Sequence, residues 1–109
     1  MFNSKNLNIS TAEFKEKLDS ERGVIIDVRT KEEYDAGHLK FTDDQIDFLN
    51  GDFQERVNSL DKNKTYYLYC RSGNRSGKAA QILDKEGFKN VYNVGGYEDL
   101  VNAGFESNK

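Results

Sequence analysis

The chain has little cysteine or histidine, no proline and no long apolar run. It holds one cysteine and one histidine in 109 residues. A single cysteine cannot close an intrachain disulfide, which fits a reducing compartment, so we expect a cytoplasmic protein. One cysteine and one histidine are too few for a thiolate or imidazole zinc site, and we expect neither a metal nor a cofactor. No apolar run approaches the roughly 20 residues that a membrane span requires.

Excess positive charge is also absent. The chain has 16 Lys and Arg against 19 Asp and Glu, a net charge of -3 and a pI near 5.2. Proteins that bind nucleic acid usually carry a basic patch, and no more than two basic residues are adjacent here. We therefore expect no nucleic-acid partner and no membrane partner.

The elements that are present alternate between strand and helix patterns. Capping boxes at Ser10 and Thr30 predict helix starts, and β-branched or aromatic runs predict strands. This alternation favours an α/β fold, with a mostly parallel central sheet and helices on both faces. We expect one domain over 1–109, with its core at about 7–103. The expected strands are 7–9, 24–26, 66–69 and 91–94. The first expected helix starts near Thr11, and the others are 30–36, 52–60, 76–86 and 97–103.

The most informative segment is the run that begins at Cys70. It continues as Arg71, Ser72, Gly73, Asn74, Arg75 and Ser76, between an expected strand and a helix that Ser76 can cap. Helix N-termini and nearby cations stabilise a thiolate, which is the reactive form of cysteine. Small and polar loop residues also allow several backbone N–H groups to point inward and bind an anion. The pattern predicts that Cys70 is a nucleophile for an anionic substrate; the alternative is an inert cysteine buried in the core.

Three segments together resemble the rhodanese-like family. They are Ile26–Leu39 (IDVRTKEEYDAGHL), the cysteine loop Cys70–Ser76 (CRSGNRS), and Val91–Tyr97 (VYNVGGY). The resemblance covers about 7–103 and implies a single-domain sulfurtransferase in which Cys70 carries sulfane sulfur as a persulfide. It also implies that the loop residues Arg71 to Ser76 bind the substrate. The family's Pro-Gly-Ala after Gly-His-Leu is replaced here by Lys40-Phe41-Thr42.

Loop length separates this family from cysteine-dependent phosphatases, which resemble it. Those enzymes place arginine after five intervening residues, whereas four residues separate Cys70 from Arg75. The shorter loop makes a tighter cradle, suited to one sulfur atom more than to a phosphate. Arg75 is the candidate for gripping the substrate's anionic end, the alternative being a structural salt bridge. Arg71 either steers anions or is a solvated surface charge.

Two further charged residues follow the expected strand at 24–26. Asp27 and Arg29 are interpreted as structural support, with Arg29 pairing with Asp27 or Glu33. His38, the only histidine, is interpreted as structural. Gly95 and Gly96 are expected to supply a tight turn, the alternative being that they form a floor for the substrate pocket.

Three functions remain open from the sequence. The first is a sulfurtransferase that moves sulfur from thiosulfate, a persulfide or a polysulfide to cyanide, a thiol or a protein acceptor. The second is a sulfur carrier, which shares Cys70 with the first. The third is a non-catalytic binding module of the same fold, although such modules usually lose the cysteine or the arginines. Because the chain has no second cysteine, sulfur on Cys70 has to leave to an acceptor outside this subunit.

Overall fold

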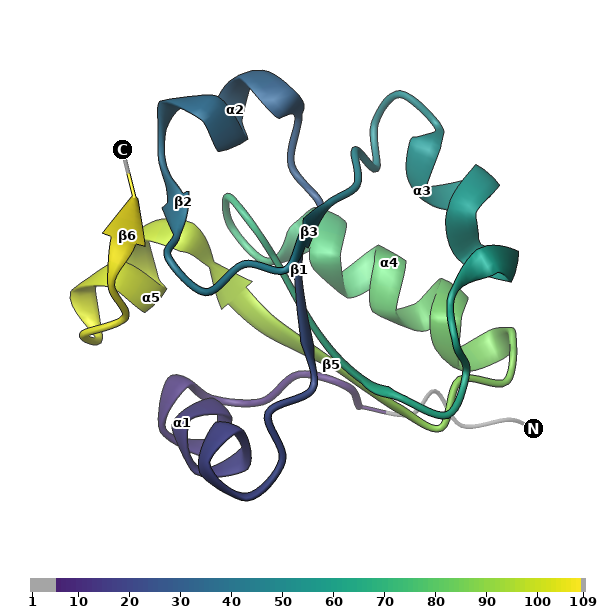
Figure 1. Cartoon of the computed structure of the whole chain (residues 1–109), viewed down its shortest axis with the longest axis horizontal. Coiled ribbons are helices and arrows are strands. Elements are labelled where there is room, and N and C mark those ends of the chain that lie inside the picture. Colours follow the sequence, from purple (N-terminus) through teal and green to yellow (C-terminus); the bar gives the residue numbers. More distant parts are fainter. Residues whose placement is uncertain (1–5, 109) are drawn as a thin grey trace.

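The centre of the molecule is a four-stranded, fully parallel sheet (Figure 1). The structure is a computed structural model that describes residues 6–108. The strand order is β3-β1-β4-β5, with bounds β1 Val24–Asp27, β3 Asp44–Gln45, β4 Thr65–Cys70 and β5 Asn90–Gly96. All six residues of β4 are buried, because this strand has a neighbour on each side and helices on each face.

Helices cover both faces of the sheet, as predicted. One core cluster joins α3, η1 and α4 to the sheet through Phe53, Val57 and Leu83, and the other joins α1 and α5 through Phe14 and Leu100. The α/β prediction with a mostly parallel sheet is therefore confirmed. The bounds are α1 Thr11–Ser20, α2 Lys31–Ala36, α3 Asp52–Arg56, the 3-10 helix η1 Val57–Ser59, α4 Asn74–Lys85 and α5 Tyr97–Asn102.

Local signals placed the first two helices correctly. The Ser10 side chain accepts a hydrogen bond from the backbone N–H of Glu13 at the start of α1. At α2, Thr30 and Glu33 form a complete capping box, and the helix ends at Gly37. Each of these signals depends on residues three or four positions apart, which is why the sequence alone locates them.

Two sequence predictions near the site are wrong. Helix α4 begins at Asn74 and not at Ser76, because Gly73 adopts φ +94 and turns the chain into the helix earlier. Gly95 and Gly96 do not form a separate turn. They are the last residues of β5 and pair with Tyr69 and Cys70 of β4, after a register shift between Leu68 and Tyr69.

The remaining strand pairing also differs from the prediction. The expected edge strand at 7–9 is reduced to a single parallel bridge between Asn8 and Asn93. A small antiparallel pair, β2 (His38–Leu39) with β6 (Ser107–Asn108), and the edge strand β3 were not predicted. Among residues 6–108, no helix has the length and apolar character to cross a membrane.

Candidate active site

The cysteine loop lies at the carboxyl end of the parallel sheet, where ligands bind in open α/β folds. Cys70 is the last residue of β4 and α4 begins four residues later, at Asn74. The neighbouring strand supports this loop closely. A Cβ atom added to Gly96 would lie 2.5 Å from the carbonyl oxygen of Arg71, so only glycine lets β5 approach the loop to this distance.

The thiol of Cys70 is fully buried and surrounded by hydrogen-bond donors. The backbone N–H of Gly73 donates to Cys70 Sγ at 3.0 Å. Burial, the largest single influence, acts to raise the pKa of the thiol. The Ser76 hydroxyl and the backbone N–H groups of Ser76, Ser72 and Gly73 act the other way, and the net pKa is lowered. Because the Ser76 hydroxyl and then the backbone N–H groups lead the contributions that lower the pKa, the thiolate depends on hydrogen bonds more than on the arginine charges that the sequence suggested.

Ser76 has two acceptors within reach of one hydroxyl proton. Its Oγ lies 2.7 Å from Asn93 Oδ1 and 3.4 Å from Cys70 Sγ. The proton can be donated to only one of them at a time. A neutral thiol is a weak acceptor and leaves the proton with Asn93, whereas a thiolate forms a charge-assisted hydrogen bond and draws it toward sulfur.

Asn93 on β5 fixes the loop and was missed by the sequence reasoning. Besides accepting from Ser76, its Oδ1 accepts from the backbone N–H of Gly95, and its Nδ2 donates to the Gly73 carbonyl and to Asn8 Oδ1. All four hydrogen bonds are between 2.7 and 3.1 Å. An asparagine inside a strand pattern is unfavourable for sheet formation, and that oddity was the available signal.

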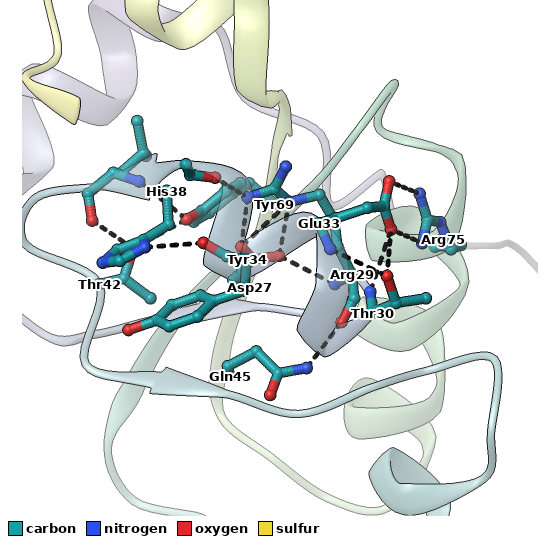
Figure 2. A network of polar contacts seen from close by, with 12 residues as sticks. Asp27, Arg29, Thr30, Glu33, Tyr34, His38, Thr42, Gln45, Tyr69 and Arg75 are labelled. Atoms are coloured by element: carbon teal, nitrogen blue, oxygen red, sulfur yellow. Dashed lines mark hydrogen bonds and ion pairs between the residues drawn. The ribbon is translucent and has the colours of Figure 1, made fainter. Parts of the chain in front are cut away.

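Arg75 does not point freely into solvent. Its guanidinium binds the Glu33 carboxylate through two hydrogen bonds of 2.8 and 3.1 Å, with both side chains half-buried (Figure 2). The hydrogen bond from Arg75 is the main reason that the pKa of Glu33 falls to about 2. Since Glu33 also completes the capping box with Thr30, it joins α2 to the cysteine loop. The salt bridge that the sequence analysis gave as the alternative role of Arg75 is therefore formed in this structure, with Glu33 as the partner.

Asp27 and Arg29 form a buried ion pair beside the loop (Figure 2). The Arg29 guanidinium makes three hydrogen bonds of 2.7 to 3.0 Å to the carboxylate, donates to the Gly37 carbonyl at 2.7 Å, and lies 4.5 Å from the ring of Tyr97. Of the two partners that the sequence offered Arg29, the structure selects Asp27 over Glu33. Arg29 also lines the pocket described next, and the supporting role of Asp27 and Arg29 stays a prediction.

Loops that follow β1, β4 and β5 line one pocket of about 440 Å³. Its walls are Arg29, Glu33, Ala36, Gly37, Arg71, Tyr97 and Glu98. Segments that follow three strands of the sheet therefore meet at one pocket, and Gly95 and Gly96 do not line it. Tyr97 and Glu98, which follow Gly96 directly, were missed by the sequence reasoning.

The other predicted residues lie around the loop. Arg71, Ser72 and Asn74 are exposed, and only Arg71 of these lines the pocket. His38 stacks on Tyr34 with ring centroids 3.8 Å apart, and its Nδ1 lies 3.0 Å from the Tyr34 carbonyl oxygen. Within residues 6–108, no three His, Cys, Asp or Glu side chains are placed to share a metal ion.

Some known proteins with similar sequences have names that refer to sulfur transfer or sulfur carriage, and others are named tRNA uridine(34) hydroxylase. "Putative sulfurtransferase YtwF" of Bacillus subtilis is 40% identical over 89 residues, which are 81% of this chain and 84% of that protein. "Putative sulfur carrier protein YrkF" of the same organism is 40% identical over 87 residues, 79% of this chain. This chain spans only 45% of the length of YrkF. "Thiosulfate sulfurtransferase PspE" of Escherichia coli is 36% identical over 78 residues, 70% of this chain and 72% of that protein.

A similar solved structure and a match to a protein family point to the same kind of domain as these relatives. The structure "rhodanese with anions from E. coli" superimposes with a TM-score of 0.66 at 33% identity, covering 79% of this chain and 96% of that one. The rhodanese-like domain matches residues 10–103. Since this match takes in all four strands of the parallel sheet and the complete cysteine loop, the chain belongs to the rhodanese-like domain family.

Proposed function

We propose that this chain is a sulfurtransferase in which Cys70 carries the transferred sulfur as a persulfide. The observation that carries the proposal is the environment of Cys70 Sγ. The Ser76 hydroxyl and the backbone N–H groups of Ser76, Ser72 and Gly73 lie around it at the N-terminus of α4 and lower the pKa of the thiol despite its burial. The relatives named as sulfurtransferases support the same reaction class.

The reaction consists of two displacements. The Cys70 thiolate attacks the outer sulfur of thiosulfate, the S–S bond of the donor breaks, and sulfite leaves with the bonding electrons. Cys70 then holds a terminal persulfide anion within the same set of N–H donors. Cyanide or a thiolate attacks that outer sulfur, and Cys70 is released as a thiolate. An organic persulfide or polysulfide donor reacts in the same way and releases a thiolate or a shorter polysulfide.

The loop residues have distinct roles in this proposal. The N–H groups of Ser72, Gly73 and Ser76 hold the negative sulfur, and Asn74 begins the helix whose N-terminus faces it. Arg71 and Arg75 provide positive charge for the donor's anionic end, and Arg75 has to leave or share Glu33 to do so. Asp27 and Arg29 support the wall of the pocket from beneath.

Intact-mass spectrometry tests the reaction directly. Wild type and Cys70→Ser are incubated with thiosulfate, and then with cyanide or glutathione. We expect wild type alone to gain one sulfur, about 32 Da, and to lose it when the acceptor is added. If neither thiosulfate, polysulfide nor glutathione persulfide adds sulfur to Cys70, the sulfurtransferase proposal is wrong and a binding module becomes the better description.

A sulfur carrier is the second candidate. It is favoured by the absence of a second cysteine in the sequence and by the similarity to the putative carrier YrkF. Steady-state rates separate the two roles. Slow turnover with cyanide and small thiols, together with fast transfer from persulfidated Cys70 to a protein acceptor, would favour the carrier.

A further inference from the structure

The pocket beside the cysteine loop is larger than an inorganic sulfur donor requires. Its volume is about 440 Å³. Thiosulfate has five heavy atoms, which fill roughly 150 Å³ if each takes the space of one water in the liquid. The pocket falls instead in the range of sites that bind small organic molecules. It therefore has room for the organic part of a thiol or persulfide whose sulfur reaches the loop.

The charges that line this pocket divide into two paired and two unpaired groups. Arg29 is neutralised by Asp27, and Glu33 is neutralised by Arg75. Arg71 and Glu98 also line the pocket, and among the described residues the side chain of neither makes a hydrogen bond or an ion pair. The pocket thus presents one available positive charge and one available negative charge.

Sheet register keeps these two charges on adjoining walls. Cys70 of β4 pairs with Gly96 of β5. Arg71 comes one residue after Cys70, and Glu98 comes two residues after Gly96, so both follow the same end of the sheet. Arg71 and Glu98 are not bonded to each other, and the buried side chain of Tyr97 forms the wall next to Glu98. A positive and a negative side chain that line the same pocket complement a ligand that carries both charges. The negative side chain repels a ligand that carries only negative charge.

We propose that this pocket binds low-molecular-weight thiols and persulfides that carry both a carboxylate and an ammonium group, as amino-acid-derived thiols do. Arg71 pairs with the carboxylate and Glu98 with the ammonium. The inference rests on the proposed function for its sulfur step. In that step the ligand's thiolate attacks the outer sulfur on Cys70, the Sγ–S bond breaks, and the products are an organic persulfide anion and the Cys70 thiolate.

A panel of acceptors tests the assignment. Cys70 is first loaded with inorganic polysulfide, and discharge is then followed by intact mass with 2-mercaptoethanol, 3-mercaptopropionate, cysteamine and cysteine at matched thiolate concentrations. We expect wild type to have its lowest KM for cysteine. Glu98→Gln should raise the KM about threefold to fivefold for cysteamine and cysteine but not for 3-mercaptopropionate. Arg71→Gln should raise it for 3-mercaptopropionate and cysteine but not for cysteamine.

The matched control is Asp99→Asn, which removes the same charge one residue from Glu98 on α5, at a position that does not line the pocket. It should leave the order of the four KM values unchanged. The proposal is overturned if Glu98→Gln changes all four KM values equally or none of them, or if wild type shows no preference for cysteine over the singly charged thiols.

A binding measurement separates this inference from the sulfurtransferase proposal. S-methylcysteine has both charges but cannot accept sulfur, and its binding can be followed by the backbone amide NMR signals of Arg71 and Glu98. Saturable shifts in wild type that weaken in Glu98→Gln would support the pocket assignment even if Cys70 never takes up sulfur. Sulfur transfer without such shifts would leave the reaction standing and refute the assignment.

Discussion

Removing the Asp27 carboxylate should cost a large part of the stability of this protein. The side chains of Asp27 and Arg29 are 0% and 6% exposed, and the carboxylate accepts three hydrogen bonds from the guanidinium and one from the Arg29 backbone N–H. In Asp27→Ala the buried guanidinium keeps the Gly37 carbonyl and the rings of Tyr97 and Tyr69 as partners, and no negative charge accepts a hydrogen bond from it. Breaking a buried pair on one side costs about 3–5 kcal/mol.

That loss is large relative to the roughly 5–15 kcal/mol that stabilises a domain of this size. It corresponds to a fall in Tm of roughly 10–20 °C. Urea unfolding at constant m-value measures it directly. The matched control is Asp35→Ala, which removes an exposed carboxylate paired with Lys31 and should cost under about 0.5 kcal/mol.

A double variant tests the physical reason for the loss. Asp27→Leu combined with Arg29→Met removes both charges and leaves no buried ion without a partner, so it should recover at least half of the stability lost in Asp27→Ala. A loss below about 1 kcal/mol in Asp27→Ala, or a double variant as unstable as the single one, would refute the ion-pair argument.

Three other variants probe the loop. The pKa of Glu33 is lowered to about 2, so the stability that its carboxylate contributes is complete above the unfolded pKa of about 4.5 and is lost as pH falls toward 2. Glu33→Gln should therefore be less stable than wild type by about 1–3 kcal/mol at pH 6. Its urea unfolding midpoint should also change less than that of wild type between pH 5 and pH 2. Ser76→Ala should raise the pKa of Cys70, seen as a shift of the iodoacetamide alkylation profile to higher pH; an unchanged profile would contradict a hydroxyl bond to the thiolate. In Gly96→Ala the new methyl group has to displace the Arg71 carbonyl, so the variant should lose about 1–3 kcal/mol of stability and form the persulfide with thiosulfate more slowly. Wild-type stability and a wild-type rate would be inconsistent with the close approach of β5 to the cysteine loop.

The sequence predicted those parts of the fold and site that depend on neighbouring residues. The capping boxes at Ser10 and Thr30 and the buried strand before Cys70 are local patterns, and each was located within a residue or two. The start of α4 was misplaced because Ser76 looks like a better cap than Gly73. Its hydroxyl is instead used by Asn93 and Cys70, inside the first turn of the helix.

The missing parts depend on residues far apart in the chain. Glu33 and Arg75 are 42 positions apart, so nothing in either segment indicates that they meet. The two-residue strands β2 and β6 pair residues about 70 positions apart and are too short to show any periodicity. Asn93 reaches Asn8 and the Gly73 carbonyl only after the parallel sheet has formed.

Burial of Cys70 and its lowered pKa act together on the chemistry open to this thiol. An exposed thiolate is readily oxidised by dissolved oxidants, whereas Cys70 Sγ is covered and reacts only with molecules that reach the loop. The donors that offset burial are the Ser76 hydroxyl and, after it, the backbone N–H groups of Ser76, Ser72 and Gly73, which cannot rotate away as an arginine side chain can. The same donors can hold a sulfur atom added to Sγ, because the added atom carries the negative charge. In the proposed function that sulfur leaves to an acceptor outside the chain, because the sequence has no second cysteine, and the pocket that Arg71 lines is the proposed place where such an acceptor binds.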